Sequence, residues 1–432
     1  MSFSGIFARI VAMIGGSMIL LRRWGTETPD PAFGAEPAIP EAKPQGIPTL
    51  KMPTAVGWSG DHVPTAAPGL KVNAFARDLE HPRWIYVLPN GDVCVAEALS
   101  EPGGIRNAFD YAIYATMKRA KAVGKSANRI TLFRGLDASG AAAERHVFKD
   151  QLFFPFGMTM VNGTFYVCNT DALISFDYQD GATRLAGDGT TLASFKPHGH
   201  WTRSLLASAD GSRIYVGVGS LSNIADQGME AEEGRAAIHE FDVATGASRI
   251  FAGGLRNPVG VAFEPTRNTL WTVVNERDGL GDETPPDYLT SVVDGGFYGW
   301  PYCYWGQTVD DRVPQDAAMV ATAVRPDYAL GGHTASLGLC WVPEGTLPGL
   351  PAGMAIGQHG SWNRSNLSGY KVILVPFVDG KPSGAPIDIL TGFLAEDEKQ
   401  CYGRPVGVTL GPDGSLLVAD DVGNVIWRVT GA

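Results

Sequence analysis

The stretch that decides the fold is GGLRNPVGVAFEPTRNTLWTVVNERDGLGDETPPDYLTSVVDGGFYGWPYCYW, residues 253–305. Two apolar runs, residues 259–263 and 269–274, flank a turn that contains Pro and Asn. Apolar runs of this length joined by turn residues are typical of paired β-strands. An acidic loop, residues 275–283, follows the second run. Charged residues on a loop at a strand end are where a rigid scaffold often carries chemistry.

The same pattern of apolar run, Gly-containing turn and second apolar run recurs along the chain. The copies span residues 81–97, 154–168, 203–218, 257–274, 337–357 and 404–420. They begin roughly 50–80 residues apart, a spacing typical of propeller blades with inserted loops. We therefore predict an all-β fold, a six-bladed β-propeller. The alternative is a pair of β-sandwiches in which similar hairpins recur by coincidence, because Asn-Gly and Asp-Gly turns are common in all-β folds.

Composition restricts the class of protein. A chain of 432 residues exceeds the usual size of a single core unless the fold is modular. The net charge of −11 argues against nucleic acid as a partner. None of the five cysteines forms a CxxC pair, so no zinc ribbon or thioredoxin-type site is predicted. A disulfide among Cys303, Cys340 and Cys401 remains open.

The N-terminal part divides into two segments ahead of the propeller. Residues 1–23 contain a mostly apolar run, 10–21, that is too short for a ~20-residue membrane span and fits a signal peptide or an uncleaved membrane anchor. Residues 24–68 are a Pro-rich linker or arm, with seven prolines in residues 26–56. Residues 69–432 are then the six-bladed β-propeller catalytic domain.

One stretch departs from the strand pattern. After the first copy, apolar residues spaced about four apart over residues 105–120 predict an amphipathic helix with basic residues around it, inserted between two strands of the first blade. We expect this helix to pack on the propeller; the alternative is that its basic face meets a membrane or a partner protein.

Several polar residues lie near the starts of the repeats, where the ends of propeller inner strands surround a central channel. They are Arg83, His200, Arg203, Arg256, Asn257, His333, His359, Arg364 and Arg404. A ring of arginines suits a planar, polyanionic ligand, since each guanidinium offers forked, charge-assisted hydrogen bonds. The alternative is that each arginine closes its own blade. His200 could act as a general base near neutral pH.

The acidic loop could hold a metal ion. Glu276 and Asp278, with Gly279 beside them, place hard oxygen donors on a flexible loop, which suits Ca²⁺ although the spacing is not that of an EF-hand. The alternative is a solvated acidic loop. No GxSxG, HExxH or GxGxxG after a strand is present, so serine hydrolase, zincin and NAD-dependent functions lack support.

These motifs, taken together, are similar to those of a known family. Residues 254–263, 275–278 and 294–301, with Gly-His-Trp-Thr-Arg at 199–203, Gly-Ser-Trp-Asn-Arg at 360–364 and Arg-Pro-Val-Gly-Val at 404–408, resemble the glucose/sorbosone dehydrogenases over roughly residues 69–430. That resemblance implies a six-bladed propeller that binds pyrroloquinoline quinone (PQQ) at the channel mouth, with Ca²⁺ polarising the cofactor. It also implies that His200 takes the proton of the substrate hydroxyl while hydride passes to the quinone.

The resemblance assigns Arg256, Asn257, Arg364 and Arg404 to the cofactor and the loop of Glu276, Asp278 and Gly279 to Ca²⁺. From their place near the starts of the repeats, we also expect Arg203 and His333 to bind the cofactor. Glucose-oxidising members carry Asp where this chain has Gly219-Ser220, and the Gly-His-Trp-Thr-Arg form is more similar to the sorbosone dehydrogenase branch. An aldose or an osone such as L-sorbosone is the implied substrate.

Such enzymes work outside the cytoplasm. We therefore expect a periplasmic protein, held to the inner membrane through residues 1–23 or released, that passes electrons to a quinone or a cytochrome. Two other functions stay open at this point. One is a propeller module that binds a ligand and catalyses nothing, and the other is a Ca²⁺-dependent propeller lactonase, which would need carboxylate and Asn ligands rather than several arginines.

Overall fold

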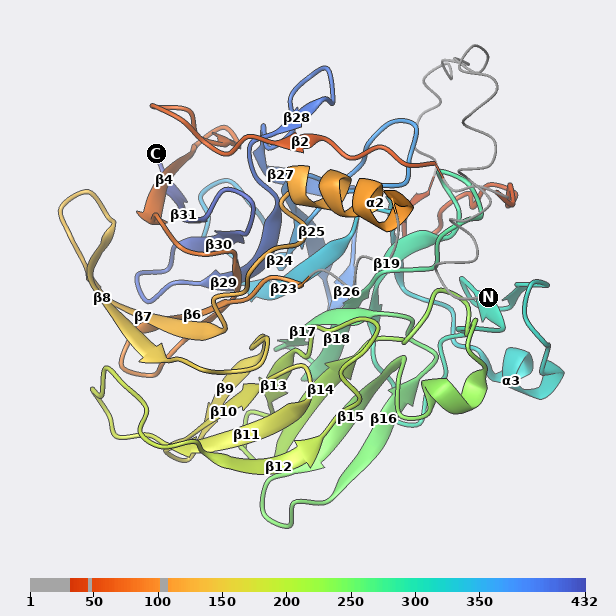
Figure 1. The fold of residues 1–432 in the computed structure, drawn as a ribbon, viewed down its shortest axis with the longest axis horizontal. Coiled ribbons are helices and arrows are strands. Elements are labelled where there is room, and N and C mark those ends of the chain that lie inside the picture. The colour runs from red at the N-terminus through yellow and green to blue at the C-terminus, as the bar shows by residue number, and fades with distance from the viewer. Residues whose placement is uncertain (1–31, 46–48, 102–107) are drawn as a thin grey trace.

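The computed structural model describes residues 32–45, 49–101 and 108–432, and it confirms the six-bladed β-propeller. Six sheets surround a common centre, as Figure 1 shows. Residues 1–23, predicted as a signal peptide or anchor, lie outside the described residues. Within the described part of the chain, no helix is both long enough and apolar enough to span a membrane.

The first three blades each contain four consecutive antiparallel strands. Blade 1 is β5 (Pro82–Val87), β6 (Val93–Glu97), β7 (Arg129–Leu136) and β8 (Ala142–Lys149). Blade 2 is β9 (Met158–Val161), β10 (Thr164–Cys168), β11 (Ala172–Asp177) and β12 (Thr190–Ser194). Blade 3 is β13 (Leu205–Ala207), β14 (Arg213–Val218), β15 (Ala237–Asp242) and β16 (Ser248–Gly253). In each blade the repeat found in the sequence forms the first two strands.

Blades 4 and 5 recruit short strands from the N-terminal arm. Blade 4 is β17 (Pro258–Glu264), β18 (Thr269–Val274), β19 (Pro286–Ser291) and β22 (Tyr328–Gly332), extended by β1 (Phe33–Gly34). Blade 5 is β23 (Ser336–Val342), β24 (Gly353–Gln358), β25 (Lys371–Val378) and β27 (Ile387–Thr391), extended by β3 (Thr65–Ala66), with β26 (Lys381–Pro382) on β25.

Blade 6 closes the ring with strands from both ends of the chain. It is β29 (Pro405–Leu410), β30 (Leu416–Asp420) and β31 (Val425–Gly431), followed by β4 (Leu70–Ala76). In the β31–β4 pair Val429 lies opposite Val72. Smaller elements are β2 (Thr54–Ala55) with β28 (Gln400–Cys401), β20 (Cys303–Tyr304) with β21 (Thr308–Val309), a 3₁₀ turn (Met229–Glu232), α2 (Ala108–Arg119) and α3 (Ala317–Thr322).

Glycines in the repeats allow the inner strands of successive blades to approach. A Cβ atom added to Gly407 would lie 2.7 Å from the carbonyl oxygen of Arg83, and one added to Gly260 would lie 2.8 Å from that of Leu337. Gly338 faces Val406 even more closely. The repeated Pro-Val-Gly-Val motif therefore supplies backbone contact between blades, which a larger residue would prevent.

The core lies between the blades. The second strands β6, β18, β24 and β30 are buried almost throughout, since neighbouring blades cover both of their faces. Aromatic rings join adjacent blades; Trp271 of blade 4 packs edge-to-face on Phe377 of blade 5, with centroids 5.0 Å apart. All five cysteines are free, so the disulfide left open for Cys303, Cys340 and Cys401 is not formed.

The described parts of the N-terminal arm, residues 32–45 and 49–68, contact the propeller. The amide of Lys43 donates to the carbonyl of Leu280 at 2.8 Å, and the amide of Lys51 donates to that of Trp362 at 2.8 Å. Further along, the indole Nε1 of Trp58 donates to Asp420 at 2.6 Å. The division of the chain at residues 23 and 68 stays a prediction.

The helix inserted in blade 1 is confirmed as α2, between β6 and β7 (Figure 1). Ala120, just beyond its end, is buried and Lys118 is exposed. The helix packs on the propeller near the channel mouth through the residues that follow it.

Candidate active site

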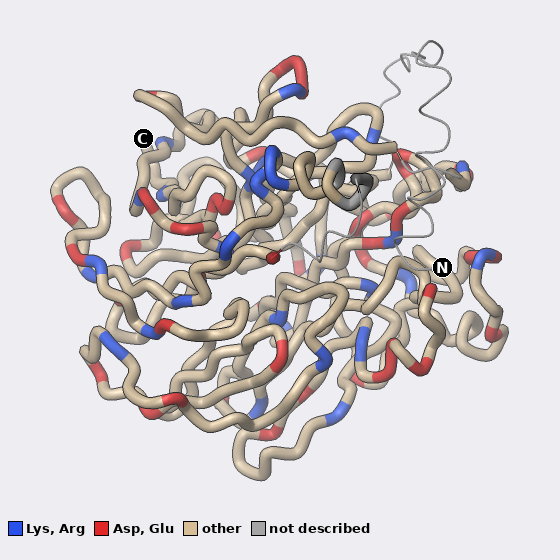
Figure 2. The backbone as a smooth tube through the Cα atoms, in the orientation of Figure 1, with Lys and Arg blue, Asp and Glu red and all other residues tan. Residues whose placement is uncertain are grey.

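The candidate residues gather at one face because of strand direction. The first strand of each blade begins at this face and the second strand ends there. Residues just before the first strands and just after the second strands therefore converge, although they are far apart in sequence. Figure 2 shows basic residues at the end of α2, where Lys118 and Arg119 lie in the last turn.

His200 precedes the inner strand of blade 3 and is held by Ser220. Its Nδ1 lies 2.8 Å from the carbonyl oxygen of Ser220 and 3.2 Å from the Ser220 hydroxyl. A carbonyl only accepts, so Nδ1 carries the proton and Nε2 is left as an acceptor. Burial and the guanidinium of Arg256 lower the pKa of His200 to about 3, so the imidazole is neutral at neutral pH.

Arg203 lies behind His200 and is fully buried. Its guanidinium donates to the backbone carbonyls of His200 at 2.7 Å, Thr202 at 2.9 Å and Lys196 at 3.1 Å. Burial and the neighbouring Arg235 lower the pKa of Arg203 to about 10. This placement shapes the loop that presents His200.

Arg256 joins the loops of blades 3 and 4. It donates to the carbonyl of Glu276 at 2.6 Å, to Oδ1 of Asn223 at 3.0 Å and to Oδ2 of Asp278 at 3.2 Å. Asn223 also accepts from the amide of Asp278 at 2.8 Å. Asn223 therefore braces the arginine and the aspartate together.

Asp278 is also tied to blade 5. Its Oδ1 accepts from Nδ2 of Asn363 at 2.7 Å, and Asn363 lies 3.3 Å from Nδ1 of His333. Nε2 of His333 donates to the carbonyl of Gly281 at 2.9 Å. Next to them, Arg364 donates to the carbonyl of Gly332 at 2.9 Å and to Glu283 at 2.5 Å. His333 and Arg364 thus belong to the same network as Arg256.

Asn257 sits between His200 and the end of β14. Its Oδ1 is buried and has no hydrogen-bond partner among the described residues. A Cβ at Gly219 would collide with Asn257 and would lie 2.6 Å from the Cβ of His200. A residue larger than glycine would therefore collide with Asn257 and His200 at this position.

The predicted metal ligands differ in whether their oxygen atoms already accept hydrogen bonds. Oε1 of Glu276 is buried without a partner in the part of the chain described, and burial raises the pKa of Glu276 to about 7. The carbonyl of Gly279 already accepts from the amide of Gln45 at 3.0 Å and from Arg312 at 2.9 Å. Across residues 32–45, 49–101 and 108–432, no group of three His, Cys, Asp or Glu side chains is arranged to hold a metal ion.

A cavity of about 180 Å³ continues the site across blades 6 and 1. Its lining includes Arg83, Lys121, Trp201, His359, Arg404 and Asp421. Arg404 donates to the carbonyls of His359 at 2.8 Å and Gly360 at 2.5 Å. Burial and Arg404 lower the pKa of His359 to about 3.

Asp421 is the carboxylate of this cavity. His359 lies 2.9 Å from it, His81 lies 3.0 Å from it, and Arg83 forms an ion pair with it. Burial would raise the pKa of Asp421, but these three groups hold it well below its ordinary value. The guanidinium of Arg83 lies over the ring of Trp201, 5.2 Å from its centroid. Trp201, the residue after His200, lines this cavity, whereas His200 itself does not.

Comparison with known proteins identifies the family. A sequence model described as TrAA12-like matches residues 64–432. The chain belongs to the TrAA12-like family. This confirms the broader relationship to PQQ-dependent sugar dehydrogenases implied by the motifs.

Two curated proteins are similar in sequence to this TrAA12-like chain over part of their length. An uncharacterized protein of Borreliella burgdorferi is 31% identical over 238 residues, which cover 53% of this chain and 60% of the relative. A PQQ-dependent pyranose dehydrogenase of Coprinopsis cinerea is 27% identical over 387 residues, which cover 73% of this chain and 52% of the relative. The chain therefore spans about half to three fifths of the length of these two relatives.

Solved structures share the fold of the TrAA12-like chain. The PQQ domain of the Coprinopsis cinerea pyranose dehydrogenase, in its holo form, has a TM-score of 0.68 at 22% identity and covers 88% of this chain and 100% of that one. A calcium structure of the Trichoderma reesei family AA12 enzyme has a TM-score of 0.70 at 20% identity, covering 89% and 99%. At these identities the likeness shows the fold alone.

Sequence reasoning missed three residues that this TrAA12-like site uses. They are Asn223, Asn363 and Asp421. Asn363 could have been found, since it stands inside the quoted Gly-Ser-Trp-Asn-Arg motif next to Arg364. Asp421 directly follows the second strand of blade 6, in the place where blade 4 carries its polar loop. Asn223 has no sequence signal, because only the fold of the loop after β14 brings it to Arg256.

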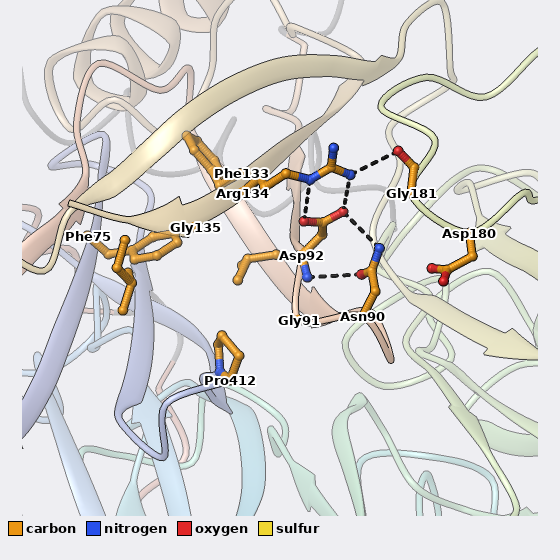
Figure 3. A pocket seen from close by; sticks show the side chains of 12 residues that line it. Phe75, Asn90, Gly91, Asp92, Phe133, Arg134, Gly135, Asp180, Gly181 and Pro412 are labelled. Atoms are coloured by element: carbon orange, nitrogen blue, oxygen red, sulfur yellow. Dashed lines mark hydrogen bonds and ion pairs between the residues drawn. The ribbon is translucent and has the colours of Figure 1, made fainter.

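A larger cavity of about 520 Å³ lies elsewhere on the TrAA12-like propeller (Figure 3). It is lined by the turns after β5 and β29, at the opposite ends of the inner strands from His200 and Arg404. There Nε and Nη2 of Arg134 donate to Asp92 at 2.8 and 2.6 Å, and Nη2 also donates to the carbonyl of Gly181 at 3.0 Å (Figure 3). None of the predicted site residues lines this cavity.

Proposed function

We propose that this chain is a PQQ-dependent oxidoreductase that oxidises a sugar. The observation that carries the proposal is a cavity lined by Arg83, Arg404 and Lys121 and by Trp201, the residue that follows His200, whose Nε2 is an acceptor. The name of the Coprinopsis cinerea relative, a PQQ-dependent pyranose dehydrogenase, supports the same activity.

The residues of the cavity fit the chemistry of PQQ, a planar quinone with several carboxylates. Nε of Arg83 is buried and has no hydrogen-bond partner among the described residues, so this guanidinium has a donor to spare. Arg404 uses Nε and one terminal nitrogen for backbone carbonyls. Forked guanidinium donors bind carboxylates with strong, oriented hydrogen bonds. We expect Arg83 and Arg404 to hold carboxylates of the cofactor, and Asn257 to donate to it through Nδ2, since its Oδ1 is buried against Gly219.

His200 would act on the substrate. With its Nδ1 proton fixed on the Ser220 carbonyl, Nε2 is the atom that accepts the proton of the substrate hydroxyl. Arg203 keeps the loop in place from behind. The bound quinone would supply the acceptor for the hydride lost from the same carbon.

Calcium is the second cofactor that we propose. Glu276 supports it best, since its Oε1 is buried and unpartnered among the described residues, whereas Asp278 is already engaged by Arg256 and Asn363. A divalent cation would remove the cost of a buried, unpaired carboxylate.

The finer parts of the proposal concern substrate, acceptor and location. As the substrate we propose an aldose or an osone such as L-sorbosone, which would react as its hydrate. A quinone or cytochrome would take the electrons. A periplasmic location, with or without membrane attachment through residues 1–23, agrees with that chemistry.

The test is reconstitution of the purified full chain. The apo-protein is titrated with PQQ in the presence of Ca²⁺, and dye reduction is then measured with aldoses, aldehydes and osones. Saturable binding followed by sugar-dependent dye reduction supports the proposal. A folded protein that binds no PQQ would favour a non-catalytic binding module or a lactonase, and lactone hydrolysis without PQQ would distinguish the second of these.

A further inference from the structure

The segment inserted in blade 1 places a lysine in the channel-mouth cavity. Lys121 follows α2, and with Ala120 and Ala122 it lines the same cavity as Arg83 and Arg404. Its Nζ donates to the carbonyl of Val422 at 3.1 Å. This is the one hydrogen bond of the ammonium group among the described residues, and an ammonium has three donors. Within the part of the chain that the structure describes, two of its donors have no protein partner.

The backbone at Lys121 fixes the point from which its side chain leaves the helix. Its φ is 52°, in the left-handed region. The amide of Lys121 donates to the carbonyl of Lys118 at 3.0 Å, and the amide of Ala122 donates to that of Met117 at 2.9 Å. These two bonds form a Schellman C-cap, whose left-handed position is usually glycine. A residue other than glycine is strained in this conformation.

The charges of the cavity point to the kind of ligand. Three side chains with fixed positive charge line it, namely Arg83, Arg404 and Lys121. Asp421 is the one carboxylate in the lining, and it is already paired with Arg83, His81 and His359. The excess positive charge suits a ligand that brings at least two carboxylates.

We propose that Lys121 is an anion-binding residue of this cavity, where its ammonium contacts a carboxylate of a planar aromatic polycarboxylate. The inserted segment is then part of the ligand site. The identification of that polycarboxylate as PQQ rests on the proposed function, whereas the anion-binding role of Lys121 does not.

The test measures binding to the full chain by calorimetry with two ligands. One is PQQ with Ca²⁺, and the other is trimesate, an aromatic tricarboxylate without redox chemistry. Lys121→Met keeps most of the aliphatic stem and removes the charge. Lys121→Gly removes the charge and also relieves the left-handed backbone. Lys118→Met is the matched control, since Lys118 is exposed on the same helix.

The expected result separates binding from folding. Both Lys121 variants weaken the binding of trimesate and of PQQ tenfold or more, Lys118→Met binds like the wild type, and Lys121→Gly unfolds at the same or a higher temperature than the wild type. Wild-type affinity in both Lys121 variants overturns the inference, even where Lys121→Met lowers the unfolding temperature.

The same experiment distinguishes the two proposals. Binding of trimesate but not of PQQ by the wild type, weakened by Lys121→Met, supports the anion-binding role and contradicts the PQQ assignment. A wild-type protein that binds neither ligand overturns both.

Discussion

Nδ1 of His200 lies 2.8 Å from the carbonyl oxygen of Ser220, and this contact decides the tautomer of the imidazole. The same Ser220 donates its backbone amide to the carbonyl of Arg256 at 2.7 Å. His200 is therefore fixed through Ser220 to the loop that carries Arg256, just before β17.

Replacement of His200 tests its role as the proton acceptor. His200→Ala removes Nε2, so we expect dye reduction to fall by at least about 100-fold, the usual contribution of general base catalysis, while PQQ affinity changes little. Activity assays and PQQ titration on the same preparation check this. Full activity in the variant would assign the base elsewhere.

The low pKa of His200 predicts a pH effect on stability. Its ordinary pKa is near 6.5 and the folded value is about 3, so between these pH values the unfolded chain binds a proton that the folded chain does not. The contribution of His200 to stability is full above pH 6.5 and decreases as the pH falls toward 3. His200→Asn keeps a donor for the Ser220 carbonyl but cannot titrate, so its unfolding free energy should fall less steeply over that range. Parallel curves for the two proteins would contradict the assigned pKa.

Asn223 is predicted to matter although no motif contains it. Asn223→Ala removes the bonds to Arg256 and to the amide of Asp278, and we expect a loss of about 1–3 kcal/mol in unfolding free energy. PQQ and Ca²⁺ affinity should fall together, because Arg256 and Asp278 lose the same brace. Chemical denaturation and ligand titration measure the two effects. Exposed Thr245→Ala serves as a control with no contact to the site.

Close backbone contact between the inner strands predicts that two glycines differ in their effect on stability when each is replaced by alanine. Gly338→Ala would push a methyl group into the backbone of Val406 in the next blade, so we expect destabilisation of about 1–3 kcal/mol or more. Gly253→Ala meets no atom within 4 Å and serves as the matched control, with a change of about 1 kcal/mol or less. Thermal unfolding compares them. Equal effects in both variants would show that blade contact does not depend on glycine.

The arm is predicted to stabilise the site through Trp58. Trp58→Phe keeps a ring but removes the bond from Nε1 to Asp420, which in turn accepts from the amide of Arg404 at 2.8 Å. We expect a loss of about 1–3 kcal/mol and weaker PQQ binding. Tyr402→Phe, in the same ring cluster, leaves every bond to Asp420 in place and is the control. An unchanged PQQ affinity in Trp58→Phe would show that the arm does not support PQQ binding through Trp58.

The propeller could be predicted from the sequence because each blade repeats the same local signal. Runs such as residues 257–274 and 404–420 form inner strand pairs wherever they occur. The convergence of Arg256 and Arg404 on one face followed from that architecture alone. The helix α2 was predictable for the same reason, since its apolar spacing is local.

What could not be predicted depends on contacts between distant parts of the chain. Nothing in the composition of the Pro-rich arm shows that Trp58 reaches Asp420. The spacing around Arg203 placed it near the channel but did not show that backbone carbonyls would surround its guanidinium. Lys121 gave no signal as a site residue, because its position depends on a left-handed turn at the end of α2.

We propose that bound PQQ oxidises a sugar with His200 as the proton acceptor. The most direct measurement is a single turnover without dye, in which an aldose or osone is added anaerobically to the PQQ- and Ca²⁺-loaded protein and the absorbance of the cofactor is followed. We predict that the wild type reduces one equivalent of bound cofactor and that His200→Ala leaves it oxidised. A wild-type protein that binds PQQ but leaves it oxidised with every sugar and osone tested would contradict the account.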